Sequence, residues 1–132
     1  MLDRRNEIER ALHAIPLEAS LTARSIPWLQ LTRLFDAFAG IPGIGFSKMT
    51  KALYRKRPAL IPILDSVVEV YLADDGATGS FGERATALVR SYKRDVDRNR
   101  SALRELRREL AVRGHELTEV RILDILIWSV RR

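Results

Sequence analysis

Residues 41–45 read Ile41-Pro42-Gly43-Ile44-Gly45 and mark a tight turn between two segments with helical periodicity. Proline and glycine this close together favour a turn, and glycine reaches a left-handed backbone conformation without steric cost. The turn leads directly into residues 46–57, a predicted helix that Pro58 ends. Because the first N–H groups of a helix are free and its dipole is positive there, this position favours an anion such as a phosphate.

The helix predicted over residues 46–57 is basic and contains no acidic residue. Helical spacing places Lys48, Lys51 and Arg55 on one face and apolar residues on another. A structural turn followed by a solvated basic face explains the same pattern and stays open as the alternative. We expect the phosphate-binding residues to be Gly43, Ile44, Gly45, Ser47, Lys48, Lys51 and Arg55.

The chain on both sides of this stretch also predicts helices, because its apolar residues recur at three- and four-residue steps. A polar loop is expected at residues 74–80. The segment from Phe81 to Leu110 is either one long helix or two helices broken near Asn99, and Gly114 is a natural helix end. Four other helices are expected. The first covers residues 2–15, and the second starts at about residues 25–27, with Pro27 in its first turn, and ends at Gly40. The third runs from Pro62 to about residue 73, and the last is capped by Thr118.

These patterns predict one all-α domain, residues 1–132, with five to seven helices. Within it we expect a hairpin module at about residues 28–73 and a C-terminal helical part at about 80–132. Hydrophobic residues make up 46% of the chain and charged residues 30%, which is typical of a globular protein. No segment resembles a secretion signal or a membrane span, so we expect a cytoplasmic protein with no membrane partner.

The composition narrows the chemistry that the chain can perform. It contains no cysteine, which excludes disulfides and thiolate ligands, and its two histidines lie far apart. We therefore expect no metal site and no cofactor. The net charge of +6 favours an anionic partner, and nucleic acid is the partner that fits the basic helix best.

The turn Ile41-Pro42-Gly43-Ile44-Gly45 resembles the hairpin of helix-hairpin-helix DNA-binding modules, whose usual form is Leu-Pro-Gly-Val-Gly. This resemblance implies binding to the phosphate backbone of DNA without recognition of base sequence. RNA stays open as a second nucleic-acid partner. Binding without catalysis is therefore the leading functional hypothesis.

Over about residues 28–73 the resemblance extends to the helix-hairpin-helix superfamily of DNA glycosylases. In that superfamily a catalytic aspartate follows the hairpin in a pattern like Val-Asp-x-His-Val-x-Arg-Val. Asp65 lies at the corresponding place, but Val67 and Val70 replace the histidine and arginine. The alternative function is thus a reduced glycosylase or lyase that uses Asp65, with Lys48 near the place of a catalytic lysine. As a structural residue, Asp65 would stabilise the first turn of its helix or pair with Arg55 or Arg57.

Two further segments resemble a small bacterial family with no assigned activity. One segment is Lys56-Arg57-Pro58-Ala59-Leu60-Ile61-Pro62-Ile63-Leu64-Asp65, which follows the pattern Lys-Arg-Pro-x-Leu-Ile-Pro-x-x-Asp. The other is Arg121-Ile122-Leu123-Asp124-Ile125-Leu126-Ile127-Trp128, which follows Arg-Ile-Leu-Asp-x-x-x-Trp. This resemblance covers most of the chain and implies membership of a family without implying a function.

Asp124 is notable because it interrupts a very apolar helix, where an unpaired carboxylate would be costly. Arg121, three residues earlier, is its expected partner. The alternative is that Asp65 and Asp124 converge in one pocket, where two carboxylates would hold Mg²⁺ or perform acid–base chemistry. We favour structural ion pairing.

The apolar seam from Phe81 to Leu110 contains one polar residue, Asn99. A helix packed on its own core produces this pattern, and so does a coiled coil whose asparagine sets the register. We favour the first interpretation. The second leaves open a helical protein-interaction module, with a homodimer formed through residues 81–110.

Overall fold

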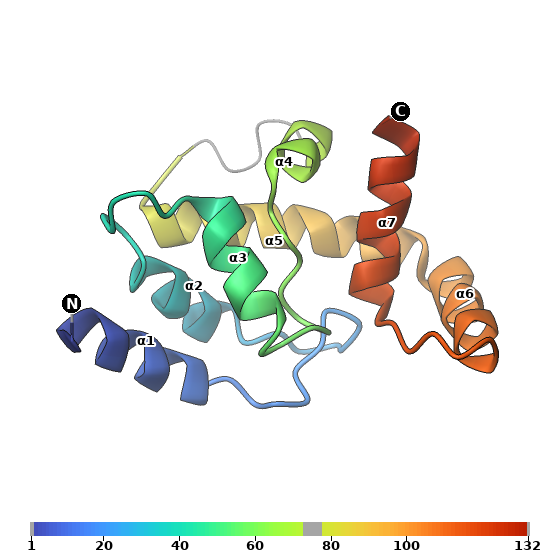
Figure 1. Ribbon diagram of the computed structural model, residues 1–132, viewed down its shortest axis with the longest axis horizontal. Coiled ribbons are helices and arrows are strands. Elements are labelled where there is room, and N and C mark those ends of the chain that lie inside the picture. The colour runs from blue at the N-terminus through green and yellow to red at the C-terminus, as the bar shows by residue number, and fades with distance from the viewer. Residues whose placement is uncertain (1, 73–77, 132) are drawn as a thin grey trace.

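The computed structural model describes residues 2–72 and 78–131 of the chain. These residues form seven α-helices and no strand, which confirms the predicted all-α class (Figure 1). Together the helices make one compact domain. The helices are α1 (Leu2–His13), α2 (Trp28–Asp36), α3 (Phe46–Tyr54), α4 (Ser66–Leu72), α5 (Phe81–Arg98), α6 (Arg100–Val112) and α7 (Glu119–Arg131).

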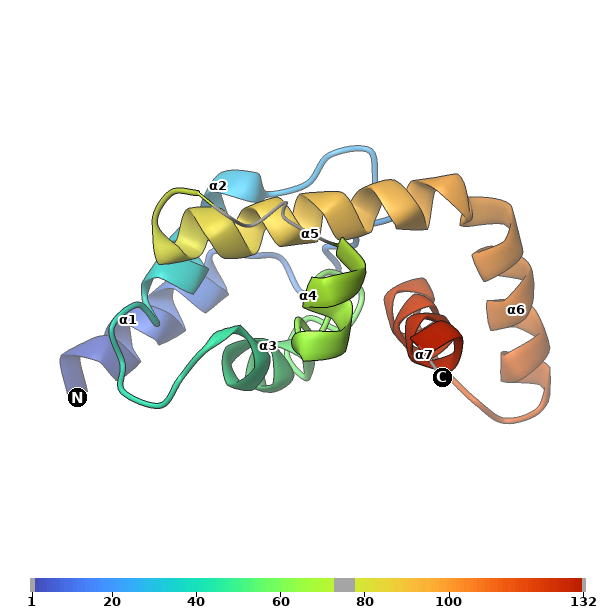
Figure 2. The same cartoon turned by 90° about the horizontal axis from the view of Figure 1, so that it is seen from above.

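Helix α5 is the longest element and runs along the molecule (Figure 2). Helix α2 packs against α5, and α1 packs against α2 at the same end. At the other end α6 turns away from α5, and α7 contacts both α6 and α4. Helix α7 therefore closes the domain by bringing the C-terminal part of the chain against the segment that follows α3.

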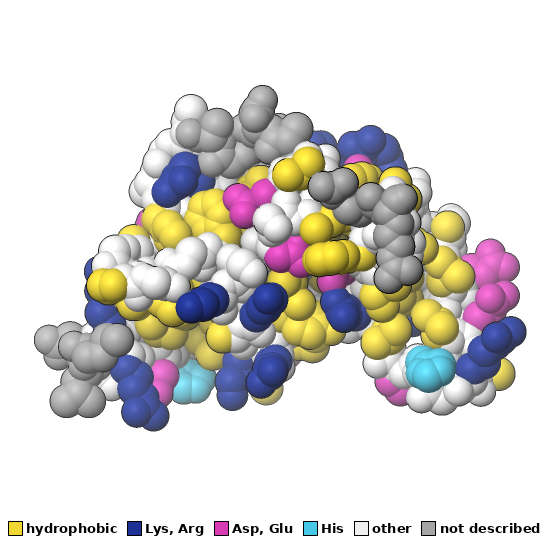
Figure 3. All heavy atoms as spheres, turned by 45° about the horizontal axis from the view of Figure 1, so that its top comes forward, with side chains coloured by type: hydrophobic (Ala, Val, Ile, Leu, Met, Phe, Trp, Pro, Cys, Tyr) yellow, Lys and Arg dark blue, Asp and Glu magenta, His cyan; other side chains and the backbone are white. Residues whose placement is uncertain are grey.

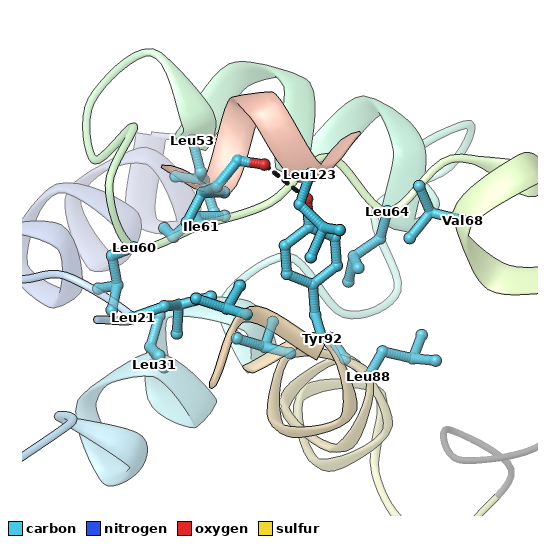
Figure 4. Close-up of a cluster of buried hydrophobic side chains, with 14 of the residues drawn as sticks. Leu21, Leu31, Leu53, Leu60, Ile61, Leu64, Val68, Leu88, Tyr92 and Leu123 are labelled. Carbon is cyan, nitrogen blue, oxygen red and sulfur yellow. Dashed lines mark hydrogen bonds between the residues drawn. The ribbon is translucent and has the colours of Figure 1, made fainter. Parts of the chain in front are cut away.

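Tyr92 of α5 lies at the centre of the core and is fully buried. Its hydroxyl donates a hydrogen bond to the carbonyl oxygen of Val120 at 2.6 Å, so its one polar group is satisfied (Figure 4). Burial in this apolar setting raises the pKa of the Tyr92 hydroxyl well above its usual value. The side chains around it come from most of the helices and include Leu21, Leu31, Leu53, Leu60, Ile61, Leu64, Val68, Leu88 and Leu123.

The C-terminal helices begin and end where the sequence predicts. The segment 81–110 forms two helices, and Asn99 lies at the break between them. Gly114 has a φ of +91°, and the N–H of His115 bonds the carbonyl of Leu110 at 2.8 Å, which is the bond that closes a glycine-terminated helix. The hydroxyl of Thr118 caps α7 by accepting the N–H of Arg121 at 3.1 Å.

The predicted loop at residues 74–80 lies partly outside the described residues, since the structure describes it only from Thr78 onward. Its last residue, Ser80, begins α5 with a capping box. The Ser80 hydroxyl accepts the N–H of Glu83, and the Glu83 carboxylate accepts the N–H of Ser80. These bonds to Ser80 lower the pKa of the Glu83 carboxyl.

Five predicted helix bounds in the N-terminal half are wrong, and the first is the end of α1, which lies at His13 instead of Ile15. Helix α2 ends at Asp36, and the next residues form tight turns up to Gly40; helix α3 ends at Tyr54. Pro27 lies just before α2 instead of in its first turn. Helix α4 begins at Ser66, and residues 61–65 before it are not helical.

The apolar seam from Phe81 to Leu110 faces the protein's own core, as the favoured interpretation predicted. Its residues Ala85, Leu88, Tyr92, Val96 and Leu103 are buried in the core cluster, and Phe81, Leu106 and Leu110 pack against it. Burial of the hydrophobic seam within the domain is enough to explain its spacing.

Within the described ranges, no helix has the length and apolar character needed to cross a membrane.

Candidate nucleic-acid interface and the adjoining polar hollow

The glycine stretch at residues 41–45 forms a tight turn directly before α3. The N–H of Ile44 bonds the carbonyl of Ile41 at 3.2 Å, and Gly43 between them has a φ of +78°, as in a type II turn. Gly45 is extended and caps α3 without any side-chain hydrogen bond. The N–H groups of the first turn of α3 are therefore not covered by a capping side chain.

The space in front of the turn is open. Gly43 and Gly45 are exposed, and a Cβ atom added at either residue would meet no other atom within 4 Å. The side chain of Ile44 between them turns inward and packs against the core. Of the predicted phosphate-binding residues in the turn, two glycines thus offer backbone to a ligand, and Ile44 holds the turn in place.

Helix α3 presents its basic face to solvent. Lys48, Lys51 and Arg55 are exposed, and none of them forms an ion pair with another described residue. Ser47 is half-buried in the first turn of the helix. The opposite face carries Met49 and Leu53, which are buried. The structure therefore brings the predicted basic residues together on one open surface.

Thr50 fixes α3 to the segment that follows it. Its hydroxyl donates to the carbonyl of Phe46 at 2.7 Å and accepts the N–H of Leu64 at 2.8 Å. This contact fixes the segment before α4 to the middle of α3. Phe46 also packs against Phe81, with ring centroids 4.9 Å apart, which joins the start of α3 to the start of α5.

Arg57 does not belong to the exposed basic face, although the sequence places it in the same run. It is buried, and its guanidinium donates to the carbonyl oxygens of Leu12 at 3.0 Å and Ile15 at 2.8 Å. These carbonyls lie at the C-terminal end of α1, where a positive charge is favoured. Arg57 is a structural residue that joins α1 to the chain after α3.

Asp65 caps α4 and holds the side chain of Trp128. One carboxylate oxygen accepts the N–H of Val68 at 3.0 Å, and the other accepts the indole N–H of Trp128 at 3.1 Å. The expectation that Asp65 lies inside the first turn of a helix opened by Pro62 is wrong, because Asp65 precedes that helix. The expected ion pair with Arg57 is also wrong, since Arg57 bonds main-chain carbonyls.

The segments that resemble the small bacterial family meet in one hollow. Asp65 comes from the first segment, and Arg121, Asp124 and Trp128 come from α7. Lys51 of α3 lies at the same hollow, so the basic face of α3 is continuous with it. The hollow has a volume of about 490 Å³, and its remaining walls come from Ile63, Ile125 and Ser129. Figure 3 shows acidic side chains on this side of the molecule among lysine or arginine side chains.

Asp124 is the most unusual residue of this hollow. One of its carboxylate oxygens, Oδ2, forms the predicted ion pair with Arg121, while Oδ1 is buried and has no hydrogen-bond partner. Burial raises the pKa of the Asp124 carboxyl, Arg121 opposes this effect, and the negative charge of Asp65 adds to it. The two aspartates thus share one electrostatic environment.

A metal centre has little support in the described part of the chain. No three of its histidine or acidic residues lie close enough together to hold a metal ion. Asp65 uses both carboxylate oxygens for protein donors, and the cations Lys51 and Arg121 line the same hollow.

Sequence reasoning missed Trp128 as a site residue and did not connect Lys51 with the aspartates. Two features of the sequence pointed to these residues. Asp65 and Trp128 are the last residues of the two segments that resemble the bacterial family, and Asp124 is a single carboxylate in an apolar helix. The contact itself depends on how α7 crosses the chain after α3, which residue spacing does not reveal.

The fold and the hollow define a small helical protein with an open basic face beside a polar pocket. The model of a family of unknown function, DUF6308, matches residues 1–131, and the chain belongs to this family. No curated protein and no solved structure matches the chain.

Proposed function

We propose that this protein binds nucleic acid through its phosphate backbone, with DNA as the expected partner and no recognition of base sequence. The glycine turn at residues 41–45 would act as a helix-hairpin-helix element, in which Gly43, Gly45 and the first turn of α3 receive one phosphate. Lys48, Lys51 and Arg55 would contact neighbouring phosphates as point charges.

The observation that carries this proposal is the combination of an open helix start with unpaired cations. Gly45 leaves the start of α3 without a capping side chain, and open space lies in front of it. Three basic side chains follow on the exposed face of α3, with no acidic partner in the part of the chain that the structure describes. In contrast, other basic residues, such as Lys93, Arg107 and Arg121, are paired with carboxylates. A cationic surface that the fold itself leaves unneutralised supports an anionic partner.

The geometry favours binding over catalysis by Asp65. Both of its oxygens already accept hydrogen bonds from protein groups, and one of these bonds caps α4. A general base needs an oxygen within hydrogen-bond reach of the proton it removes. These two bonds give Asp65 a structural role, as the cap of α4 and the holder of Trp128, that explains its presence without catalysis.

The test is the affinity for a labelled duplex across a salt series, comparing the parent with a Lys48→Ala/Lys51→Ala variant. We expect the parent to bind with a dissociation constant of about 10⁻⁴–10⁻⁶ M at physiological salt. Because each lost phosphate contact removes about 0.9 from the slope of log affinity against log salt, the double variant should bind more weakly with a slope reduced by about 2.

A matched control removes the same charge elsewhere. Arg104 and Arg108 are exposed on α6, so Arg104→Ala/Arg108→Ala changes the net charge equally. The proposal fails if no duplex binds at low salt, or if the control weakens binding as much as the α3 variant does.

A further inference from the structure

An apolar groove lies between α1, the turns that follow α2, and α3. Figure 2 shows α1 and α3 on the same side of α5. We propose that this groove binds an acidic amphipathic helix of a partner protein, which lays its apolar face in the groove and its carboxylates against a basic rim. The inference goes beyond nucleic-acid binding, because no residue that lines the groove belongs to the proposed phosphate-binding set.

The first argument is the apolar lining of the groove. Its volume is about 520 Å³, and almost all of the surface inside it is apolar. The apolar residues that line it are Ile8, Leu12, Phe38, Ile41, Ala52 and Leu53. Apart from Leu53, which is buried, these residues are half-buried or exposed, so water still reaches the groove. A contiguous apolar surface with a polar rim is typical of a site that binds a partner.

The second argument is that the groove is already formed in the free protein. Near the start of α1, the guanidinium of Arg4 donates to the carbonyl oxygen of Ala37 at 2.6 Å, just after α2. Near the end of α1, Arg57 donates to the carbonyl oxygen of Leu12 at 3.0 Å. These contacts fix α1 relative to the chain after α2 and after α3. A partner therefore binds without the cost of ordering the groove.

The third argument is the charge of the rim. Arg4 and Arg5 lie on the α1 side of the groove, and Lys56 lies on the opposite side, just after α3. The one acidic residue in the lining is Glu9, which pairs with Arg5 at 3.3 Å. Among the described side chains, Arg4 and Lys56 form no ion pair. Carboxylates on both flanks of an apolar stripe would therefore meet cations on both sides of the groove.

A helix fits this groove better than an extended peptide does. An extended peptide needs hydrogen-bond partners for its backbone, but the groove offers almost no polar surface, and the described residues contain no strand edge. A helix satisfies its own backbone groups, so it can lie on an apolar surface at no such cost. It also covers the open side of the groove, which a single alkyl chain would leave exposed to water.

The experiment measures the fluorescence anisotropy of two labelled synthetic peptides of about 15 residues, a length at which an isolated helix begins to form. In the first peptide, leucine recurs at three- and four-residue steps, glutamate flanks this face, and alanine fills the other positions. The second peptide has lysine in place of every glutamate. At physiological salt we expect the glutamate peptide to bind about tenfold more tightly than the lysine peptide.

The Ala52→Gln variant tests the place of binding. Ala52 is an exposed residue of α3 that lines the groove, so a longer side chain there leaves the core intact. A bound helix would cover the new amide and remove its water, so the affinity for the glutamate peptide should fall about tenfold. The matched control Ala102→Gln makes the same change at an exposed residue of α6 and should keep the parental affinity.

The Lys56→Glu variant tests the charge of the rim. It should weaken binding of the glutamate peptide about fivefold and strengthen binding of the lysine peptide, whereas Arg108→Glu on α6 should change neither by as much.

Three results would overturn the inference: no binding of the glutamate peptide, equal affinity of the parent for both peptides, or parental affinity in Ala52→Gln. A parent that sediments as a dimer and that Ala52→Gln converts to a monomer would also overturn it, because the groove would then hold a second copy of the chain. Duplex binding is measured separately on the same variants, so either proposal can fail without the other.

Discussion

The basic run that begins at Lys48 and ends at Arg57 contains two regions with different roles. Lys48, Lys51 and Arg55 extend into solvent from α3 and pair with no acidic residue of ranges 2–72 and 78–131. Arg57, just beyond the helix, is buried and bonds main-chain carbonyls at the end of α1. Residues of one chemical type, a few positions apart, are thus divided by the path of the backbone into a surface available for a ligand and a support for the fold.

Replacing Arg57 should have the largest effect on stability. Arg57→Met keeps much of the side-chain length but removes the donors to Ile15, which leaves the carbonyl oxygen of Ile15 without a partner, whereas the Leu12 carbonyl still accepts the N–H of Ile15. We expect a loss of about 1–3 kcal/mol in the free energy of unfolding, which is the cost of one unsatisfied buried group. Urea denaturation followed by circular dichroism measures it.

The matched substitution Arg55→Met tests the other region of the run. Arg55 is exposed, so its replacement should change stability by no more than about 0.5 kcal/mol. It should instead weaken the binding of duplex DNA. Similar stability losses in the two variants would remove the distinction drawn between these regions.

Gly45→Ser separates the stability of the turn from its proposed function. Gly45 has a φ of −103°, which any residue adopts, and serine is a good cap for a helix start. The new hydroxyl should accept an N–H of α3 and stabilise the protein by a few tenths of a kcal/mol. The same group would cover the N–H donors that we propose for phosphate, so duplex affinity should fall by several-fold relative to the parent.

Equilibrium titration with duplex and urea denaturation of the same sample measure both effects of Gly45→Ser. A variant that becomes more stable and binds duplex as well as the parent would show that the start of α3 holds no phosphate. The turn would then be a structural connection only.

The smallest expected effect concerns Asp124, which is buried like Arg57 but only half satisfied. Its raised pKa means that the folded state binds a proton more tightly than the unfolded chain, whose reference value is 3.8. The contribution of Asp124 to stability is therefore largest in acid and falls as the pH rises from about this value through the raised pKa. Above that range the contribution stays constant.

Asp124→Asn removes this titration. The difference in free energy of unfolding between variant and parent should shift in favour of the variant as the pH rises through this window. Urea denaturation at several pH values, with Asp97→Asn as the control for an exposed carboxylate, measures the shift. Parallel profiles for parent and Asp124→Asn would show that burial does not perturb this carboxyl.

Much of the fold could be predicted from local signals. The glycine end at Gly114 and the cap at Thr118 depend on neighbouring residues alone, and both are confirmed. Of the two arrangements left open for residues 81–110, the structure has the one with a break at Asn99. The segment before α4 makes a contact that local signals do not show, since Thr50, fourteen residues before Leu64, accepts the N–H of Leu64.

The residues of the candidate site likewise fall into those that local spacing predicts and those whose contacts depend on the tertiary structure. The basic face of α3 follows from helical spacing and was predicted in full, and so was the Arg121–Asp124 pair. The role of Arg57 was not predictable, because its partners belong to α1. The contact between Asp65 and Trp128 was not predictable either, since it joins residues far apart in the sequence.

The sequence by itself determined the helical class, most of the helix ends, the turn at residues 41–45 and the charge that α3 exposes. Each depends on residues within a few positions of one another, where backbone geometry and side-chain spacing suffice. Only the tertiary structure decided which arginine is buried, how α7 lies against the chain after α3, and that Asp65, Asp124 and Lys51 share one hollow. These outcomes depend on packing between distant segments, where burial and long-range hydrogen bonds set the free energy.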